Sequence, residues 1–354
     1  ATLMLAEGLR ETLAATGSPD NVMALMIGAQ NEVESGIKRE AAAVMQTQEE
    51  VLRLADRQPL ATADLTVLIT LPKRHNGQTS NVAMRGISPG AFAVRPQVRL
   101  AEGRMFAPGT QEVIVGRAVM KKYSGTDLGQ ELHLVGTKWR VVGIFDAGNT
   151  AFNSEIWGDV NILLSSFRRE QFSSVTFRMQ PGADFEGLKL RLEKDPRLAV
   201  SIQRERDYYE AQSQDLAMFI RYLGIFVSIV FSMGAVIGAM ITMYSAVANR
   251  IREIGILRAL GFSQMVVFWA FVKECLVIGF VGGVCGLVLA SSLSFITFAT
   301  TNFATFADLA FGFKLTPAIS LWSLVFALLM SLAGGALPAF RAARLPIIDT
   351  LRAE

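Results

Sequence analysis

The sequence predicts a membrane protein of the α+β class, in which a bundle of transmembrane helices is joined to a large external domain of mixed α/β structure. The first observation behind this prediction is a segregation of charge. The chain has 354 residues, with 34 Lys and Arg against 31 Asp and Glu, and a net charge of +3. Residues 1–215 carry 51 of these 65 charges, and the remaining 139 residues carry 14. This division excludes a single water-soluble globule.

The second observation is a set of three uncharged runs, at 223–248, 275–307 and 315–340. Each run exceeds the roughly 20 residues that a helix needs to cross the hydrocarbon core of a bilayer. The predicted transmembrane helices are 219–247, 264–297 and 317–338.

Basic residues near the ends of these spans predict their orientation. Arg250, Arg252 and Arg258 lie between the first and second spans, and three more arginines follow the third. We therefore expect the segment 248–263 and the tail 339–354 to be cytoplasmic.

The loop 298–316, between the second and third spans, is then external, together with everything before residue 219. Carrying so long a segment across a membrane needs an earlier span. We therefore expect residues 1–13 to be the outer end of a first transmembrane helix, which would be the fourth span of the bundle.

The segment 14–203 alternates short strand and helix patterns, which predicts an external α+β domain. Residues 175–203 are expected to form a βαβ unit. The following segment, 204–218, contains no Gly or Pro, which favours a stalk helix running into the first span.

The external part shows no catalytic or metal-binding motif. Asp146, Glu155 and Asp159 are expected to be solvated loop groups, and His75 and His133 lack the spacing of metal ligands. Its charge is balanced, and its basic residues form no cluster larger than pairs such as 121–122. The sequence therefore predicts no nucleic-acid partner.

The most informative segment is 248–263, ANRIREIGILRALGFS. Its apolar residues recur every three or four positions and its charged residues occupy the other positions, which predicts a short amphipathic helix. Two roles fit this pattern. The helix could lie on the lipid surface with its arginines reaching into the headgroups, or it could dock a cytosolic partner.

Within this segment, the string NRIREIGILRALGFS resembles the coupling segment of the MacB/FtsX-type ABC transporter permeases. Three further parts of the chain resemble the same family. Residues 85–106 (RGISPGAFAVRPQVRLAEGRMF) and 113–145 resemble its external-domain signature, and 338–352 (PAFRAARLPIIDTLR) resembles its C-terminal tail. Glu274 and the glycines that follow it resemble the family's next-to-last span. These glycines are Gly279, Gly282, Gly283 and Gly286.

The resemblance implies four transmembrane helices, a dimer of two permease copies, and an ABC ATPase on the cytoplasmic side. The chain contains no G-x-x-x-x-G-K-[ST] loop, so ATP and Mg²⁺ are expected to be used by a separate ATPase chain. This chain is expected to bind no cofactor or metal and to be no enzyme by itself. The predicted ATPase contacts, with Ile254 and Leu257 as the apolar anchors, are Arg250, Ile251, Arg252, Glu253, Ile254, Leu257, Arg258, Leu260 and Gly261.

Two groups of residues inside the spans are predicted to act in packing. Gly234 and Gly238 allow close approach of helices, either in a dimer interface or within the chain, whereas the four glycines at 279–286 favour packing within the chain. Lys273 and Glu274 lie inside the second span, where charges are costly. We expect Glu274 to pair across helices and Lys273 to extend toward the membrane surface.

The predicted function is that of the permease subunit of a MacB-like transporter in a bacterial inner membrane. In this family, ATP hydrolysis is expected to move the external domains, an action called mechanotransmission, for export or extraction of a substrate. A periplasmic adaptor and an outer-membrane channel are possible further partners. The alternative is an FtsX-like signalling permease that controls a cell-wall hydrolase. A secondary transporter or channel is disfavoured by the scarcity of charge in the spans.

Overall fold

The computed structural model describes residues 2–55, 57–295, 297–301 and 307–344. The chain separates into two compact units. The first, which we call the sheet unit, comprises Gly8–Ala217 and Thr297–Gly312. The second, the helical unit, comprises the described residues of 2–7, 218–295 and 313–344.

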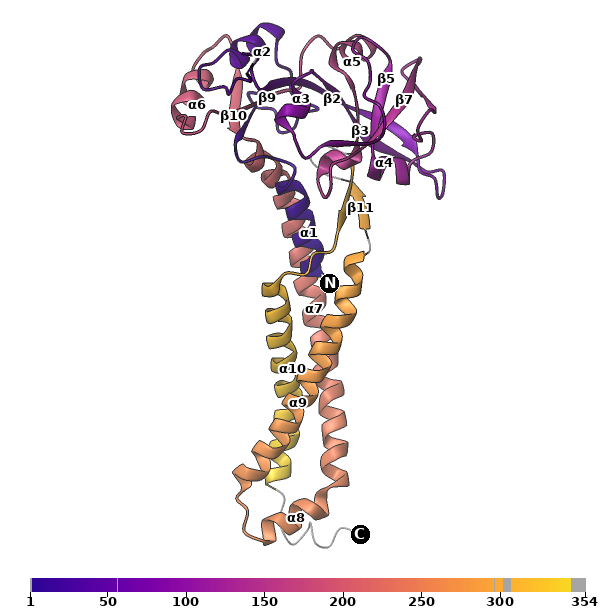
Figure 1. Cartoon of the computed structure of the whole chain (residues 1–354). Coiled ribbons are helices and arrows are strands. Elements are labelled where there is room, and N and C mark those ends of the chain that lie inside the picture. The colour runs from indigo at the N-terminus through magenta and orange to yellow at the C-terminus, as the bar shows by residue number, and fades with distance from the viewer. Residues whose placement is uncertain (1, 56, 296, 302–306, 345–354) are drawn as a thin grey trace. The chain divides into compact units, whose positions relative to one another are not determined.

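The sheet unit is built on a mixed sheet with the strand order β10-β1-β9-β2-β3-β8-β5-β7-β4, and β6 pairs with β7 (Figure 1). Two neighbouring pairs, β3 with β8 and β5 with β7, are parallel, and the other pairs are antiparallel. The strands are β1 (Asn21–Met26), β2 (Ala61–Pro72), β3 (Thr79–Ile87), β4 (Arg99–Gly103), β5 (Glu112–Gly116), β6 (Glu131–Leu134), β7 (Thr137–Asp146), β8 (Glu155–Asp159), β9 (Ser174–Arg178) and β10 (Val200–Arg204).

Short helices connect these strands. The expected βαβ unit is present in split form, because β9 and β10 both pair antiparallel with β1, which lies between them. Helix α1 is shared by the two units. The helices are α1 (Thr2–Ala14), α2 (Arg39–Gln46), α3 (Ala91–Val94), α4 (Arg117–Lys122), the 3₁₀ turn η1 (Ala151–Ser154), α5 (Val160–Ser166) and α6 (Phe185–Glu193).

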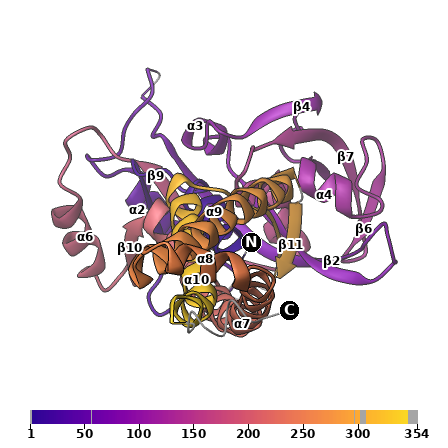
Figure 2. The same ribbon diagram turned by 90° about the horizontal axis from the view of Figure 1, so that it is seen from below.

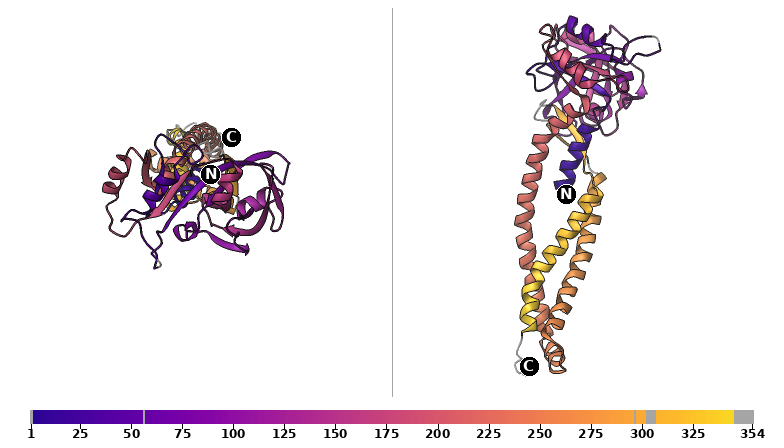
Figure 3. Two further views of the ribbon diagram at one scale, coloured as in Figure 1. Left: turned by 90° about the horizontal axis from the view of Figure 1, so that it is seen from above. Right: turned by 90° about the vertical axis from the view of Figure 1, so that its left-hand side faces the viewer.

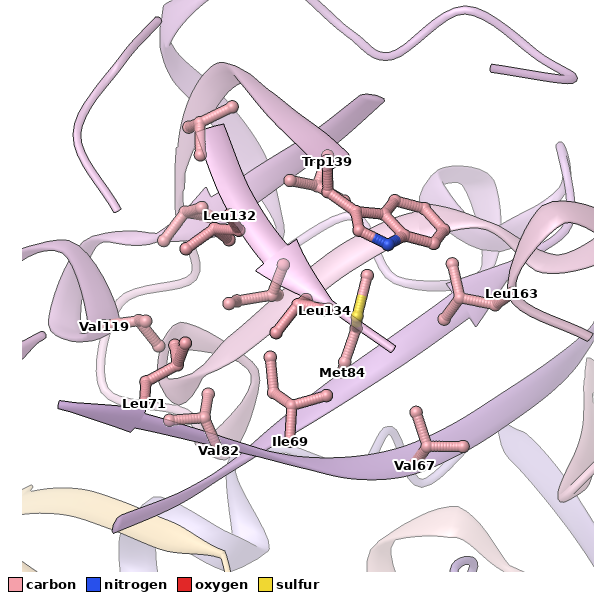
Figure 4. Close-up of a cluster of buried hydrophobic side chains, with 14 of the residues drawn as sticks. Val67, Ile69, Leu71, Val82, Met84, Val119, Leu132, Leu134, Trp139 and Leu163 are labelled. Atoms are coloured by element: carbon pink, nitrogen blue, oxygen red, sulfur yellow. The ribbon is translucent and has the colours of Figure 1, made fainter. Parts of the chain in front are cut away.

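Among the described residues, the long strand β2 contributes to two apolar clusters of the sheet unit. The first half of β2 packs with β1, β9, β10, α2 and α6. Its second half packs with β3, β5, β6, β7 and α5. Figure 4 shows this second cluster, in which Val67, Ile69 and Leu71 are directed toward Leu134 and Trp139. Alternate residues of β2 face this cluster because successive strand side chains point to opposite faces.

The helical unit contains three helices that are long and apolar enough to cross a membrane. They are α7 (Glu205–Asn249), α9 (Gln264–Ser291, extended by the 3₁₀ turn η2, Ser292–Phe295) and α10 (Pro317–Ala343), with the short helix α8 (Ile251–Ala259) between the first two. The hydroxyls of Ser263 and Thr316 cap α9 and α10 by accepting hydrogen bonds from backbone N–H groups. Pro317 occupies the first turn of α10, where its missing N–H costs nothing.

Helices α9 and α10 pack side by side, whereas α7 meets them near the end that carries α8 (Figure 3, right). Figure 2 shows the same helices from below, with α8 among them. The α9–α10 contact is antiparallel and repeats every four residues. Cys275 lies against Gly335, and four residues further on Gly279 lies against Ser331. Small residues at these positions allow the two backbones to approach closely.

The interval 298–316 was expected to be an external loop, but its described residues, 298–301 and 307–316, include strands. It contains β12 (Asp308–Gly312) and most of β11 (Thr297–Thr301), which pair antiparallel and belong to the sheet unit. Strands β4 and β8 and helix α5 were also missed by the sequence reasoning. These elements are short, and β8 (EIWGD) and β4 (RLAEG) contain a Gly and acidic residues that strands usually lack.

Candidate functional site

Helix α8 is held against the three long helices by one face. Ile254 is 3% exposed and lies in a cluster with Met243 and Val247 of α7, Val267 of α9 and, from α10, Ala339. The prediction that Ile254 anchors a cytosolic partner is therefore wrong, because its side chain is enclosed within this chain. Its burial fixes α8 to all three helices.

Several apolar residues that follow Ile254 are exposed. Of the predicted contacts, Leu257 is 42% exposed and Leu260 is 73% exposed. Ile256, which was not predicted, is 47% exposed. Arg252 and Glu253 are exposed beside them. The structure therefore brings together an apolar patch with both signs of charge at its edge, which suits recognition of a partner surface.

The remaining residues predicted for partner contact have structural roles in this chain. Arg250 precedes α8, and Ile251 is its first residue and half-buried. Arg258 is half-buried and donates a hydrogen bond to the carbonyl of Phe262 at 3.4 Å. Gly261 has φ +92, a left-handed conformation that ends the helix and that other residues adopt at a cost.

The partner expected for Glu274 is Arg250. One nitrogen of this guanidinium lies 3.2 Å from the carboxylate, and the two side chains are 48% and 36% exposed. The pair links the α7–α8 junction to α9. Lys273 lies beside Glu274 and is exposed, and none of the ion pairs among the described residues includes it.

The predicted packing glycines divide into two groups. A side chain at Gly279 or Gly283 would meet α10, whereas nothing lies within 4 Å of the corresponding positions at Gly282 and Gly286. The expectation that these two pack within the chain is therefore wrong for Gly282 and Gly286. The pair at 234 and 238 on α7 is also open. Sequence reasoning missed Gly334, which lies against Ala239 of α7.

A network of buried charges lies in the sheet unit where α7 begins. Arg85, on β3, is 1% exposed. Its guanidinium donates two hydrogen bonds to Glu32, at 2.6 and 2.8 Å, and two to Glu155 of β8, at 2.8 and 2.9 Å. Such bidentate pairs fix both the direction and the distance of the carboxylates. Arg85 therefore joins two segments that are far apart in sequence.

Arg95, which follows α3, is the second guanidinium of the network. It donates hydrogen bonds to Asp64 of β2 at 2.6 Å and to Glu205 at 3.4 Å. Glu205, the first residue of α7, is fully buried. Its other oxygen accepts from the backbone N–H of Ser18 at 3.0 Å and from the side-chain amide of Asn21 at 2.8 Å. The first turn of α7 is thus fixed by charge as well as by packing.

The network overcomes the usual effect of burial on ionisation. Burial would raise the pKa of Glu32, but attraction and hydrogen bonds from Arg85 hold that pKa below its ordinary value. Burial would lower the pKa of Arg95, but attraction by Asp64 and Glu205 raises it. These groups are therefore ionised and paired, which is typical of a structural network and not of acid–base catalysis.

Two acidic residues expected to be solvated lie in this region instead. Glu155 is 7% exposed and is paired with Arg85. Asp159 is 9% exposed, and its carboxylate caps α5 by accepting from the backbone N–H groups of Asn161 and Ile162. Asp146 remains partly exposed, with a 3.5 Å ion pair to Arg117. The expectation was wrong for the first two residues.

A second charged contact holds the β11–β12 hairpin, which lies between α9 and α10 in the sequence. Asp308, at the start of β12, is 7% exposed. Its carboxylate accepts from the hydroxyl of Tyr123 at 2.7 Å and forms ion pairs with Lys122 and Lys73. Burial would raise the pKa of Asp308, but hydrogen bonds from Lys122 and Tyr123 lower it to about 2. This carboxylate ties β12 to the end of α4.

Among the residues that the structure describes, no group of three or more His, Cys, Asp or Glu side chains could hold a metal ion. The molecule is therefore defined by three membrane-length helices, a mixed α/β unit, and an exposed patch on the short helix between two of the spans.

Comparison with known proteins places this architecture in a family. Residues 1–195 match the model of the MacB-like periplasmic core domain, and residues 225–347 match that of the FtsX-like permease C-terminal region. The chain belongs to the MacB/FtsX-like family of ABC transporter permeases. It is a membrane protein whose first matched region is a periplasmic-type domain.

Curated relatives agree with this assignment. The chain is 23% identical over 308 residues to the uncharacterized ABC transporter permease YknZ of Bacillus subtilis, covering 80% of this chain and 73% of the relative. It is 26% identical over 322 residues to the macrolide export ATP-binding/permease protein MacB of Burkholderia thailandensis, covering 84% of this chain. It spans about half, 47%, of the length of that MacB protein.

Among solved structures, the periplasmic region of MacB from Actinobacillus actinomycetemcomitans is similar with a TM-score of 0.41 and 12% identity, over 57% of this chain and 96% of that one. The extracellular domain of YknZ is similar with a TM-score of 0.39 and 16% identity, over 52% of this chain and 99% of that one.

Proposed function

We propose that this chain is the permease subunit of a MacB-like ABC transporter, and that it couples ATP hydrolysis by a separate ATPase chain to movement of the sheet unit. This movement would serve export or extraction of a substrate at the cell envelope. The observation that carries the proposal is an open patch on α8, at Leu257 and Leu260, next to the buried Ile254 that packs against the three long helices.

Burial of Ile254 gives α8 the properties of a lever. A partner that pushes on the exposed residues of α8 pushes on a helix whose Ile254 is packed against α7, α9 and α10. Close-packed contacts transmit displacement because they cannot be compressed. The proposed ATPase surface is therefore the exposed set Ile256, Leu257 and Leu260, with Arg252 and Glu253 giving charge complementarity.

Two of the segments that connect the units contain a buried carboxylate in the sheet unit. Helix α7 begins with Glu205 in the Arg95 network, and the segment between α9 and α10 contains Asp308. Both connections therefore begin at fixed positions in the sheet unit. This supports mechanotransmission, in which motion of the helices is passed to an external domain.

The complex that we propose contains an ATPase dimer, which uses ATP and Mg²⁺, and a second copy of this permease in the inner membrane of a bacterium. The open glycines Gly234 and Gly238 on α7 are the proposed close-approach face of the second copy. A periplasmic adaptor and an outer-membrane channel would extend the path across the envelope. Membrane lipids would surround the remaining apolar helix surfaces.

The test separates an exposed residue of α8 from its buried neighbour. In the reconstituted complex, Leu257→Asp should abolish stimulated ATPase activity and loosen copurification of the ATPase, while the unfolding temperature of the permease stays unchanged. Ile254→Asp should instead lower the unfolding temperature, because it places a charge among buried apolar side chains. Leu190→Asp is the matched control, since Leu190 is 54% exposed in α6. Full coupling in Leu257→Asp would overturn the proposal.

A further inference from the structure

The sheet unit contains a surface cavity of about 540 Å³ that the proposed coupling does not use. It is lined by the turn between β2 and β3, by α4, by the loop that enters η1, and by Phe311 of β12. The volume lies within the range of roughly 300–1,000 Å³ that small-molecule sites occupy. Four segments distant in sequence thus converge on one concave surface.

The lining is strongly basic. Five cations face the cavity, namely Lys73, Arg74, Arg117, Lys121 and Lys122. The sheet unit as a whole has 25 basic and 26 acidic residues, a net charge of −1. The positive charge is therefore gathered at this place by the fold and is not a property of the whole unit.

The carboxylates near the cavity do not match these cations. Lys73 and Lys122 share the carboxylate of Asp308, and Arg74 pairs with Asp127 at 2.6 Å. Among the described residues, Lys121 makes no ion pair.

The fifth cation, Arg117, pairs only loosely. It lies 3.5 Å from Asp146, and both side chains are more than a third exposed. Within the part of the chain that the structure describes, five cations therefore meet three carboxylates, an excess of two positive charges.

Gathering like charges around a cavity is unfavourable, because the cations repel one another through a site that holds less water than open solution. The repulsion is relieved by a ligand of opposite charge. An excess of two matches a dianionic group, and lysine and arginine side chains from separate segments are the usual ligands of phosphate oxygens. The apolar part of the wall, Ala118, Ala310 and Phe311, would cover the organic portion of such a ligand.

We propose that this cavity binds a ligand that carries a phosphate group. The group belongs to a soluble phosphate compound or to the headgroup of an anionic phospholipid, and the two sources share the same recognition chemistry. Lys121 and Arg117 are the principal contacts, since they are the cations with the least intramolecular pairing. The site does not depend on coupling to an ATPase and would exist in the permease alone.

The experiment measures protection of a reporter thiol in the full chain. Cys285 is replaced by Ser, and Ala118→Cys supplies a thiol in the cavity wall, because the other cysteine, Cys275, is buried. The rate of labelling by a maleimide is measured in nanodiscs of phosphatidylcholine with added pyrophosphate. It is measured again, without pyrophosphate, in nanodiscs containing phosphatidylglycerol.

Protection by pyrophosphate identifies a soluble phosphate ligand, and protection by phosphatidylglycerol identifies a lipid headgroup. In either arm, Arg117→Gln with Lys121→Gln should weaken binding about a hundredfold, since each of the two charge-assisted contacts supplies roughly a factor of ten. Added salt should weaken it as well. The matched control replaces Arg99 and Lys194, which are exposed and lie outside the cavity, by Gln.

Lys121→Gln alone provides a second test in case the double variant is unstable, because Lys121 is exposed and forms no ion pair with any residue that the structure describes. Two results would overturn the proposal. One is the absence of protection by both ligands at low ionic strength. The other is protection that persists unchanged in the cavity variants or that is lost equally in the control.

Discussion

The two ends of α7 are held in different ways. Its first turn lies in the sheet unit, where Glu205, Tyr208 and Tyr209 are almost fully buried and Tyr208 accepts a hydrogen bond from the backbone N–H of Glu32 at 3.1 Å. Further along, in the helical unit, apolar side chains such as Phe231 and Ile237 are 74% and 57% exposed. The charged network fixes the first turn of α7 within the sheet unit, whereas apolar side chains in the middle of the helix are exposed.

The largest effect should follow from breaking the fixed end. Arg85→Ala would leave the carboxylates of Glu32 and Glu155 buried without their partner. We expect a loss of about 3–5 kcal/mol in the stability of the sheet unit, which is typical for removal of one member of a buried ion pair. Chemical denaturation of the purified full chain, followed by tryptophan fluorescence, measures this loss because Trp157 donates a hydrogen bond to Glu155.

A surface pair supplies the control for this experiment. Arg104 pairs with Glu112 at 2.5 Å, but the side chain of Arg104 is 58% exposed. Exposed pairs contribute less than about 1 kcal/mol, so Arg104→Ala should change the denaturation midpoint little. Equal effects of the two substitutions would show that burial of Arg85 does not carry the stability of the network.

The next effect concerns the hairpin β11–β12. Asp308→Asn keeps the size of the side chain but removes the charge that pairs with Lys122 and Lys73. We expect a loss of about 2 kcal/mol, seen as faster amide hydrogen exchange across β12. The pKa of Asp308 is lowered to about 2, so its stabilising effect is complete above the ordinary carboxyl range. It should be lost as the pH falls from about 4 toward 2.

Asp195 is the matched control for the hairpin. Its pKa is also lowered to about 2, by hydrogen bonds from Arg197, but that pair lies within one exposed turn. Asp195→Asn should therefore leave the exchange of β12 unchanged. If acid released β12 equally in the wild type and in Asp308→Asn, the ionisation of another group would be responsible.

Much of the architecture can be predicted from the sequence because it rests on local patterns. The three spans follow from uncharged runs, and the hairpin between β2 and β3 from the Asn76-Gly77 turn, in which Gly77 has φ +68. The buried network rests on pairing across long separations. Arg85 and Glu155 are 70 residues apart and are brought together by the parallel register of β3 and β8. The sequence does not reveal this register, so in the sequence Arg85 and Glu155 are two unrelated charged residues.

The candidate sites show the same limit. Periodicity identified α8 as amphipathic, but it could not tell which apolar side faces the protein, so Ile254 was placed on the wrong surface. The basic cavity has no sequence signature larger than a pair of lysines, because the turn after β2 and helix α4 meet only in the folded sheet unit. A pattern within one helix or strand can be read from the sequence. Which other elements that helix or strand packs against cannot.

A smaller effect distinguishes the two faces of α9. Gly279→Leu would push a side chain into Ser331, whose hydroxyl donates to the carbonyl of Cys275 at 2.5 Å. Overpacking of this kind costs about 1–3 kcal/mol, so the thermal unfolding midpoint in detergent should fall. Gly282→Leu should not lower it, since Gly282 faces open space. Equal falls in both variants would contradict the assignment of Gly279, and not Gly282, to the α10 interface.

The smallest effect should come from the partly exposed pair at the α7–α8 junction. Arg250 and Glu274 are 3.2 Å apart and 48% and 36% exposed, so a double-mutant cycle with Arg250→Gln and Glu274→Gln should give a coupling energy of at most about 1 kcal/mol. The exchange Arg250→Glu with Glu274→Arg should restore most of it. A coupling of several kcal/mol would mean that lipid or the proposed ATPase covers the pair in the assembled transporter, because desolvated charges interact far more strongly. Measuring the same cycle with and without the ATPase distinguishes lipid from the ATPase as the group that covers the pair. The ATPase can be removed while the bilayer is kept.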